Sequence, residues 1–134
     1  MEDRIRVLVV DDEEVVRHGY RRVLSADGFR VMSAGDGREA LDLMGGDRFD
    51  VVLMDMRMPG MDGIELLRAI KDQWPESEVV VVTGYPSIET AKEAVKLGAY
   101  DYLAKPLVPE EVLRATTGAW MQKRWALQRE PAAV

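Results

Sequence analysis

The sequence lacks cysteine, excess positive charge and long apolar runs. With no cysteine among 134 residues, disulfides, thiol nucleophiles and thiolate metal sites are excluded. The formal net charge of −6 argues against a nucleic-acid surface, which needs clustered Lys and Arg, so no direct nucleic-acid binding is expected. No apolar run approaches the roughly 20 residues of a membrane span, and the opening MEDRIRVLVV is too short and too charged for a secretory signal. We therefore expect a cytoplasmic protein that binds no membrane and whose acidity suits a cation or a protein partner.

Short β-branched runs alternate with longer amphipathic stretches along the chain. The predicted strands are Ile5–Val10, Arg30–Ser33, Val51–Met54, Val79–Thr83 and Tyr100–Ala104. The predicted helices are Glu13–Ala26, Arg38–Met44, Ile64–Trp74, Ile88–Leu97 and Pro109 to about Gln128. Helix ends are expected at Gly28, at Gly45 with Gly46, and at Gly98, and Pro109 fits a first helical turn. Strict alternation predicts a parallel sheet with helices on both faces.

Polar side chains follow four of these strands, at the edge where ligands bind in such sheets. Asp11 and Asp12 follow the first strand, and Asp55 follows the buried run VVLM of the third. The fourth strand ends in Thr83, and Lys105 follows the fifth. Each residue alone has an ordinary structural explanation as a cap, a turn former or a surface side chain. Their joint appearance at four strand ends favours a functional site.

Three carboxylates that lie close together raise one another's pKa unless a cation sits among them. With few direct carboxylates, Mg²⁺ fits such a site better than Ca²⁺ does. The lysine and the threonine opposite the carboxylates form a pocket for phosphoryl oxygens. Asp55 is therefore a candidate nucleophile that forms an aspartyl phosphate.

Several motifs together resemble the receiver domain of two-component response regulators. They are Asp11-Asp12, Asp55 followed by MPGMDG, Thr83-Gly84, and DYLAKP at 101–106. The segment TGYPSIETAKEAVKLGAYDYLAKP is most similar to receivers of the nitrogen-regulator subfamily, which precede ATPase-type transcription activators. The resemblance implies an α/β, flavodoxin-like (βα)5 fold with strand order 2-1-3-4-5. It also implies phosphotransfer from a sensor histidine kinase to Asp55.

The resemblance further implies a role for each site residue. Asp12 and Asp55 would bind Mg²⁺ directly, Asp11 would act through water, and the backbone carbonyl of Arg57 would complete the protein ligands. Lys105 would pair with one phosphoryl oxygen, and Thr83 would donate its hydroxyl to another. Movement of Thr83 would let Tyr102 swing inward. A cis Lys105-Pro106 bond is expected, and Leu107 departs from the more usual phenylalanine.

The sequence also predicts domain limits and partners. We expect a receiver domain over 1–120 and a helical extension and tail over 121–134. The surface formed by Ile88–Leu97, Tyr100–Ala104 and the last helix is expected to mediate homodimerisation. In that helix Leu113, Trp120 and Leu127 recur every seven residues, with Trp125 off the stripe. An output domain or a separate effector protein is a further expected partner.

Two other classes of function fit the sequence less well. A haloacid-dehalogenase-like, Mg-dependent phosphatase needs a second Asp two residues after its nucleophile, where this chain has Arg57. A flavodoxin-like mononucleotide binder needs a phosphate-binding loop after the first strand, where the acidic run DDEE would repel the phosphate. The sequence thus favours a signalling domain that catalyses only its own aspartyl phosphorylation and dephosphorylation. The single histidine, His18, is expected on a helix surface and not as a phosphoacceptor.

Overall fold

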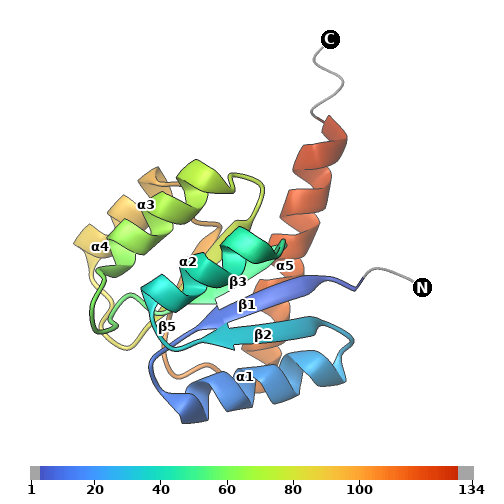
Figure 1. Ribbon diagram of the computed structural model, residues 1–134, viewed down its shortest axis with the longest axis horizontal. Helices are drawn as coiled ribbons and strands as arrows, with labels where there is room; N and C mark the ends of the chain where they lie inside the picture. The colour runs from blue at the N-terminus through green and yellow to red at the C-terminus, as the bar shows by residue number, and fades with distance from the viewer. Residues whose placement is uncertain (1–3, 130–134) are drawn as a thin grey trace.

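The computed structural model describes residues 4–129 and consists of one five-stranded parallel sheet covered by helices on both faces (Figure 1). The strand order is β2-β1-β3-β4-β5, which confirms the predicted flavodoxin-like topology. The strands are β1 (Arg6–Val10), β2 (Arg30–Ala34), β3 (Val51–Met54), β4 (Glu78–Thr83) and β5 (Asp101–Ala104). The central strand β3 is buried along its whole length, because helices cover the sheet on both sides.

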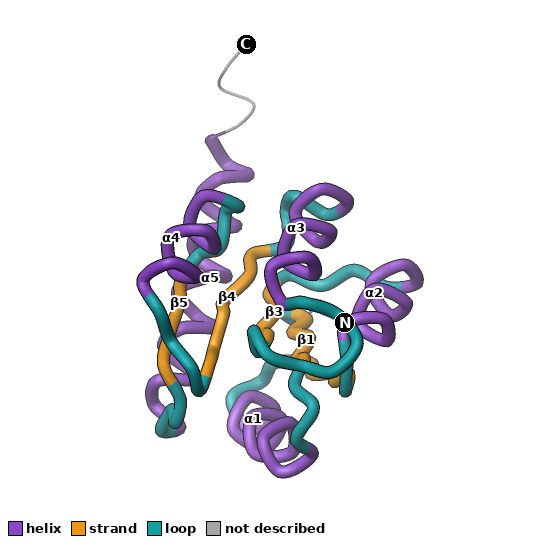
Figure 2. Tube along the Cα trace, turned by 90° about the vertical axis from the view of Figure 1, so that its left-hand side faces the viewer, coloured by secondary structure: helices purple, strands orange, loops and turns teal. Residues whose placement is uncertain are grey.

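The helices divide into two layers (Figure 2). They are α1 (Glu14–Ala26), α2 (Gly37–Gly46), α3 (Gly63–Gln73), α4 (Ile88–Lys96) and α5 (Pro109–Arg129). One apolar cluster joins a face of the sheet to α2, α3 and α4, and a second joins the other face to α1 and α5. Alternate residues of β1 and β3 enter opposite clusters, as the two-residue period of a strand requires.

The predicted helix ends at glycines are confirmed, but the third is reached in a different way. Gly28 and Gly98 have φ values of 93° and 99°, a conformation that other residues rarely adopt, and each follows a helix. Gly45 and Gly46, however, are the last two residues of α2. The chain leaves this helix through an extended Asp47, with φ of −152°, so no left-handed glycine is needed. The helix therefore ends at Gly46, two residues beyond the predicted last residue Met44.

The buried face of α5 is not the seven-residue stripe of Leu113, Trp120 and Leu127. The residues that pack on the sheet are small or polar, namely Val112, Ala115, Thr116, Ala119 and Lys123. Leu113 and Trp120 pack only at the margin of the cluster, and Leu127 is exposed. Small side chains let the helix lie close to the sheet, so the buried stripe lies one residue before the heptad positions in the sequence. Among the described residues, none of the helices is both long and apolar enough to cross a membrane.

Candidate functional site

Backbone hydrogen bonds carry the sheet one residue past its strands and thereby fix the polar side chains at its edge. The Asp11 N–H donates to the Ala34 carbonyl at 3.1 Å, and the Asp55 N–H donates to the Val10 carbonyl at 3.0 Å. The Lys105 N–H donates to the carbonyl of Thr83 at 2.8 Å. Because parallel strands end at the same edge, residues far apart in the sequence meet there, on the side of the molecule that faces the viewer in Figure 2.

Lys105 joins the two buried carboxylates. Its Nζ donates to Asp11 Oδ2 at 2.7 Å and to Asp55 Oδ2 at 2.8 Å. Asp11 is 3% exposed and Asp55 7% exposed, so their charges are only weakly screened by water. Burial alone would lower the pKa of Lys105, but the hydrogen bonds and charges of Asp11 and Asp55 raise this pKa above its ordinary value. The lysine therefore stays charged at physiological pH.

The second oxygen of each buried carboxylate is held by the backbone that follows it. Asp11 Oδ1 accepts from the Glu13 N–H at 2.9 Å, and Asp55 Oδ1 accepts from the Arg57 N–H at 3.1 Å. These local turns orient both carboxylates before any ligand binds. Arg17 donates from Nη1 to the Asp11 carbonyl at 2.7 Å, which ties α1 to the same loop.

Asp12 completes an acidic cluster beside Lys105. Asp11, Asp12 and Asp55 each offer one carboxylate oxygen, and the three atoms lie within 4.8 Å of one another. Asp12 is exposed, so the cluster opens to solvent on one side. Hard oxygen ligands at this spacing suit a divalent cation that keeps several waters, as Mg²⁺ does. The residues present thus fit the metal that the sequence predicted.

A close approach between Gly63 and Met56 shapes the loop after Asp55. A Cβ on Gly63 would lie 2.5 Å from the Met56 carbonyl oxygen and 2.7 Å from its Cα. Only glycine fits there, and the Gly63 N–H donates to the same carbonyl at 3.2 Å. The start of α3 is thereby held against the residue that follows Asp55.

Thr83 and Tyr102 lie on neighbouring strands but have different partners. Thr83 is fully buried, and its Oγ1 accepts from the Tyr85 N–H at 3.0 Å. The Tyr102 hydroxyl lies 2.5 Å from Thr90 Oγ1 and accepts from the Ser87 N–H at 3.2 Å. Tyr102 is therefore anchored at the start of α4. No hydrogen bond joins the two side chains.

Two features at this edge escaped the sequence reasoning. The Arg57 guanidinium lies 4.2 Å from the centre of the Tyr85 ring, so a cation–π contact joins the β3–α3 and β4–α4 loops. Tyr20 of α1 has a raised pKa, mainly because of burial, with Lys105 opposing the shift. Arg57 was singled out in the sequence only for its backbone carbonyl, and no motif pointed to its side chain, to Tyr85 or to Tyr20. The predicted cis Lys105-Pro106 bond is confirmed, and Leu107 packs with the α1 and α5 cluster.

The chain is similar in sequence to known proteins. The family model of the response regulator receiver domain matches residues 7–117. The response regulator MprA of Mycolicibacterium vanbaalenii is 43% identical over 109 residues, which are 81% of this chain and 47% of that protein. The chain thus spans about half the length of this curated relative.

Two solved structures show the same fold. A CheY-like receiver domain protein of Methanospirillum hungatei superposes with a TM-score of 0.90 at 27% identity, covering 92% of this chain and 99% of that one. The beryllofluoride-activated NtrC4 receiver domain dimer has a TM-score of 0.84 at 37% identity, covering 88% and 98%. The chain belongs to the response regulator receiver domain family, and its relatives include receivers of the NtrC type.

Proposed function

We propose that Asp55 accepts a phosphoryl group from the phosphohistidine of a sensor histidine kinase in a Mg²⁺-dependent reaction. The observation that carries the proposal is that both oxygens of the Asp55 carboxylate accept hydrogen bonds. Lys105 Nζ donates to Oδ2, and the Arg57 N–H donates to Oδ1. An oxygen of Asp55 attacks phosphorus, the bond between phosphorus and the donor nitrogen breaks, and the leaving imidazole takes up a proton. The product is an aspartyl phosphate.

The acidic cluster and Lys105 would receive the charge of this group. Asp12 and Asp55 would bind Mg²⁺ directly, Asp11 through water, and the Arg57 carbonyl would complete the protein ligands; a bound Mg²⁺ supplies positive charge against the phosphoryl oxygens. Lys105 then exchanges a carboxylate partner for a phosphoryl oxygen, which the short reach to Asp55 favours. Thr83 donates its hydroxyl to another oxygen once it leaves the Tyr85 N–H.

Intact-mass measurement after treatment with a small acyl phosphate tests this assignment. We expect the wild type to gain one phosphoryl group only when Mg²⁺ is present, and Asp55→Asn to gain none. Asp72→Asn, which removes an exposed carboxylate of α3, is the matched control and should label like the wild type. Equal labelling of Asp55→Asn and wild type would rule out Asp55 as the acceptor.

The metal roles have their own test. Removing Asp12 is expected to weaken Mg²⁺ binding more than removing Asp11, because Asp12 is proposed to bind the metal directly and Asp11 only through water. Titration of Asp12→Ala and Asp11→Ala with Mg²⁺ measures both affinities. The opposite order would reverse the two roles.

A groove next to Lys105 suits the kinase. It holds about 410 Å³ between α1 and α5 and is lined mainly by apolar residues that include Val15, Val16, Val23, Leu107 and Val112. Val15 is 84% exposed, which is unusual for a large apolar side chain. A donor histidine must come close to Asp55, so its protein has to cover this edge, and the apolar groove offers area for that contact.

The response to phosphorylation is proposed to pass through Thr83 and Tyr102 to α4. Movement of Thr83 toward the phosphoryl group changes the packing beside β5, where the Tyr102 hydroxyl holds Ser87 and Thr90 at the start of α4. Because this hydroxyl is shared by two partners on one helix, a shift of the ring changes the position of that helix. Lys105→Ala is expected to fold but to lose the coupling between phosphorylation of Asp55 and the position of α4. Tyr102 fluorescence or NMR shifts of α4 residues measure this coupling.

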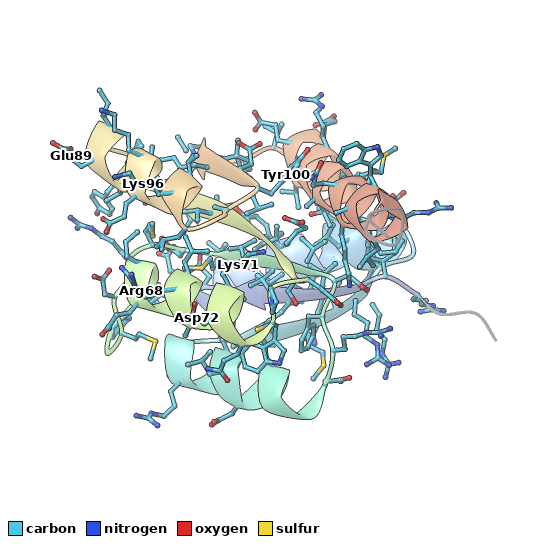
Figure 3. The ribbon with its side chains drawn as sticks, turned by 90° about the horizontal axis from the view of Figure 1, so that it is seen from above. Arg68, Lys71, Asp72, Glu89, Lys96 and Tyr100 are labelled. Carbon is cyan, nitrogen blue, oxygen red and sulfur yellow. The ribbon has the colours of Figure 1, made fainter. Side chains whose placement is uncertain are left out.

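The surface of α4, β5 and α5 is the proposed dimer interface. It exposes Ile88, Val95 and Tyr100, and Glu89 and Lys96 of α4 carry charges of both signs (Figure 3). A surface of mixed charge and exposed apolar side chains can pair with its own copy. The NtrC4 relative was solved as a receiver domain dimer in its beryllofluoride-activated form, which supports dimerisation of this chain but does not by itself identify the surface.

Light scattering with and without a phosphoryl analogue tests the dimer. We expect the analogue to promote dimers of the wild type and not of a Lys92→Glu/Lys96→Glu variant; Trp125→Ala reports whether the end of α5 takes part. A monomer in both states at high concentration would contradict the interface.

Three further expectations stay predictions. They are an output domain or effector that binds this surface, a domain limit at residue 120 and a cytoplasmic location.

A further inference from the structure

The edge of the sheet opposite the candidate site is hollowed by a cavity of about 930 Å³. Its walls come from the starts of β1 and β2, the end of α2 with the loop that follows, and α5. In Figure 1 this edge lies at the right, where β1 begins and α5 passes behind the sheet. The polar and aromatic lining residues are Arg4, Arg6, Arg30, Arg48, Asp47, Asp50 and Trp120. The proposed phosphotransfer makes no use of it.

The two carboxylates of this cavity are already neutralised. Asp47 is paired with the Arg6 guanidinium. Asp50 Oδ1 accepts from Lys123 Nζ at 2.6 Å, and its Oδ2 accepts from the Arg6 N–H at 2.8 Å. Neither acidic group therefore has a free charge with which to repel an anion.

Three further arginines line the cavity. Arg4, Arg30 and Arg48 are exposed, and within residues 4–129 none of them forms a salt bridge. In a chain of net charge −6, this is a local concentration of positive charge that the fold creates from three separate segments. Such a surface attracts anions and discriminates against cations.

We propose that this cavity, the arginine cleft, binds a small organic anion that carries adjacent phosphate groups and a flat ring, the chemistry of a nucleoside diphosphate. One guanidinium group can donate hydrogen bonds to two phosphate oxygens at once. Three such groups provide more donors than a single carboxylate can accept, so adjacent phosphate groups match them better. Trp120 offers an aromatic surface against which a ring can stack. The volume lies within the range of about 300–1,000 Å³ typical of small-ligand sites, so the cleft fits one compact ligand.

Calorimetric titration with ADP in metal-free buffer tests the cleft. Leaving out Mg²⁺ prevents the nucleotide from being carried by a metal to the acidic cluster at the other edge. We expect saturable one-to-one binding to the wild type, weakened at least about tenfold in Arg30→Gln/Arg48→Gln. Arg22→Gln/Arg114→Gln removes two exposed arginines outside the cleft and should bind like the wild type. Circular dichroism confirms that each variant is folded.

Fragments of the ligand separate the two contributions. Pyrophosphate is expected to bind more weakly than ADP but with the same dependence on Arg30 and Arg48, and adenosine is expected to bind more weakly still. No saturable ADP binding up to about 1 mM would overturn the proposal. Equal losses in the two double variants would also overturn it. Binding of a single-stranded oligonucleotide without binding of ADP would assign the surface to nucleic acid instead and refute a small-ligand site.

Discussion

Replacing Lys123 with methionine is expected to cost about 3 kcal/mol of folding free energy. Lys123 lies on α5 beyond the predicted domain limit, yet its side chain is only 6% exposed and its Nζ is 2.6 Å from Asp50 Oδ1. Methionine keeps the length and most of the apolar stem, so the packing of the helix changes little. What changes is that Asp50 loses its charged partner inside the protein.

The magnitude follows from the surroundings of Asp50. Breaking a buried ion pair costs about 3–5 kcal/mol, because the remaining charge is left uncompensated. Asp50 Oδ2 still accepts from the Arg6 N–H, and the side chain is 13% exposed, so some compensation remains. We therefore expect the lower end of the range, which corresponds to a decrease in melting temperature of about 10 °C for a chain of this size.

Urea denaturation followed by circular dichroism measures the effect. The matched control is Asp50→Asn/Lys123→Met, which removes both charges and leaves an amide oxygen to accept from the Arg6 N–H. The double variant should lose only about 1 kcal/mol, since no charge is left unpaired. A stability of Lys123→Met within about 1 kcal/mol of the wild type would contradict this expectation. So would a double variant whose loss equals the sum of the losses measured for Lys123→Met and Asp50→Asn alone.

The remaining predictions concern two glycines and one acidic residue. Gly63→Ala should lose about 2–3 kcal/mol in urea denaturation, because its Cβ would meet the Met56 carbonyl oxygen at 2.5 Å and backbone cannot easily move. Gly118→Ala should be at least as stable as the wild type: its Cβ would approach the Tyr100 side chain most closely at the hydroxyl, at 2.7 Å, where the end of the side chain can move, and alanine favours a helix by about 1 kcal/mol. Burial raises the pKa of Glu78 in the folded protein, so its ionisation opposes folding as pH rises. Thermal melts across pH should therefore show Glu78→Gln as more stable than the wild type at neutral pH, with the advantage shrinking once pH falls below the folded pKa; an advantage independent of pH would contradict this.

Much of the candidate site could be predicted from the sequence because parallel strands all end at one edge. Once the alternation of strands and helices was recognised, Asp11, Asp55 and Lys105 had to share that edge whatever the details of packing. The hydrogen bonds from Lys105 to both carboxylates confirm that they do meet. The order of the strands came from the family resemblance and not from the periodicity.

Other features depended on contacts that no local pattern encodes. The seven-residue spacing of Leu113, Trp120 and Leu127 is real, but which side of α5 packs on the sheet depends on how closely the helix can approach. Ala115 and Ala119 permit a close approach, so the buried face runs through them to Lys123. Periodicity alone does not measure the space between a helix and a sheet, so it could not show which side of α5 is buried.

The sequence by itself determined the alternation of elements, the edge at which the polar residues gather and the family to which the chain belongs. Only the tertiary structure decided which distant side chains meet. Lys123 pairs with Asp50 across 73 residues, the Arg57 guanidinium lies over the Tyr85 ring, and Arg30 and Arg48 line one cavity. The physical reason is that hydrophobic periodicity is a local property of a strand or helix. Pairing between distant charges depends on the positions of whole elements, and these are fixed only when the core is packed.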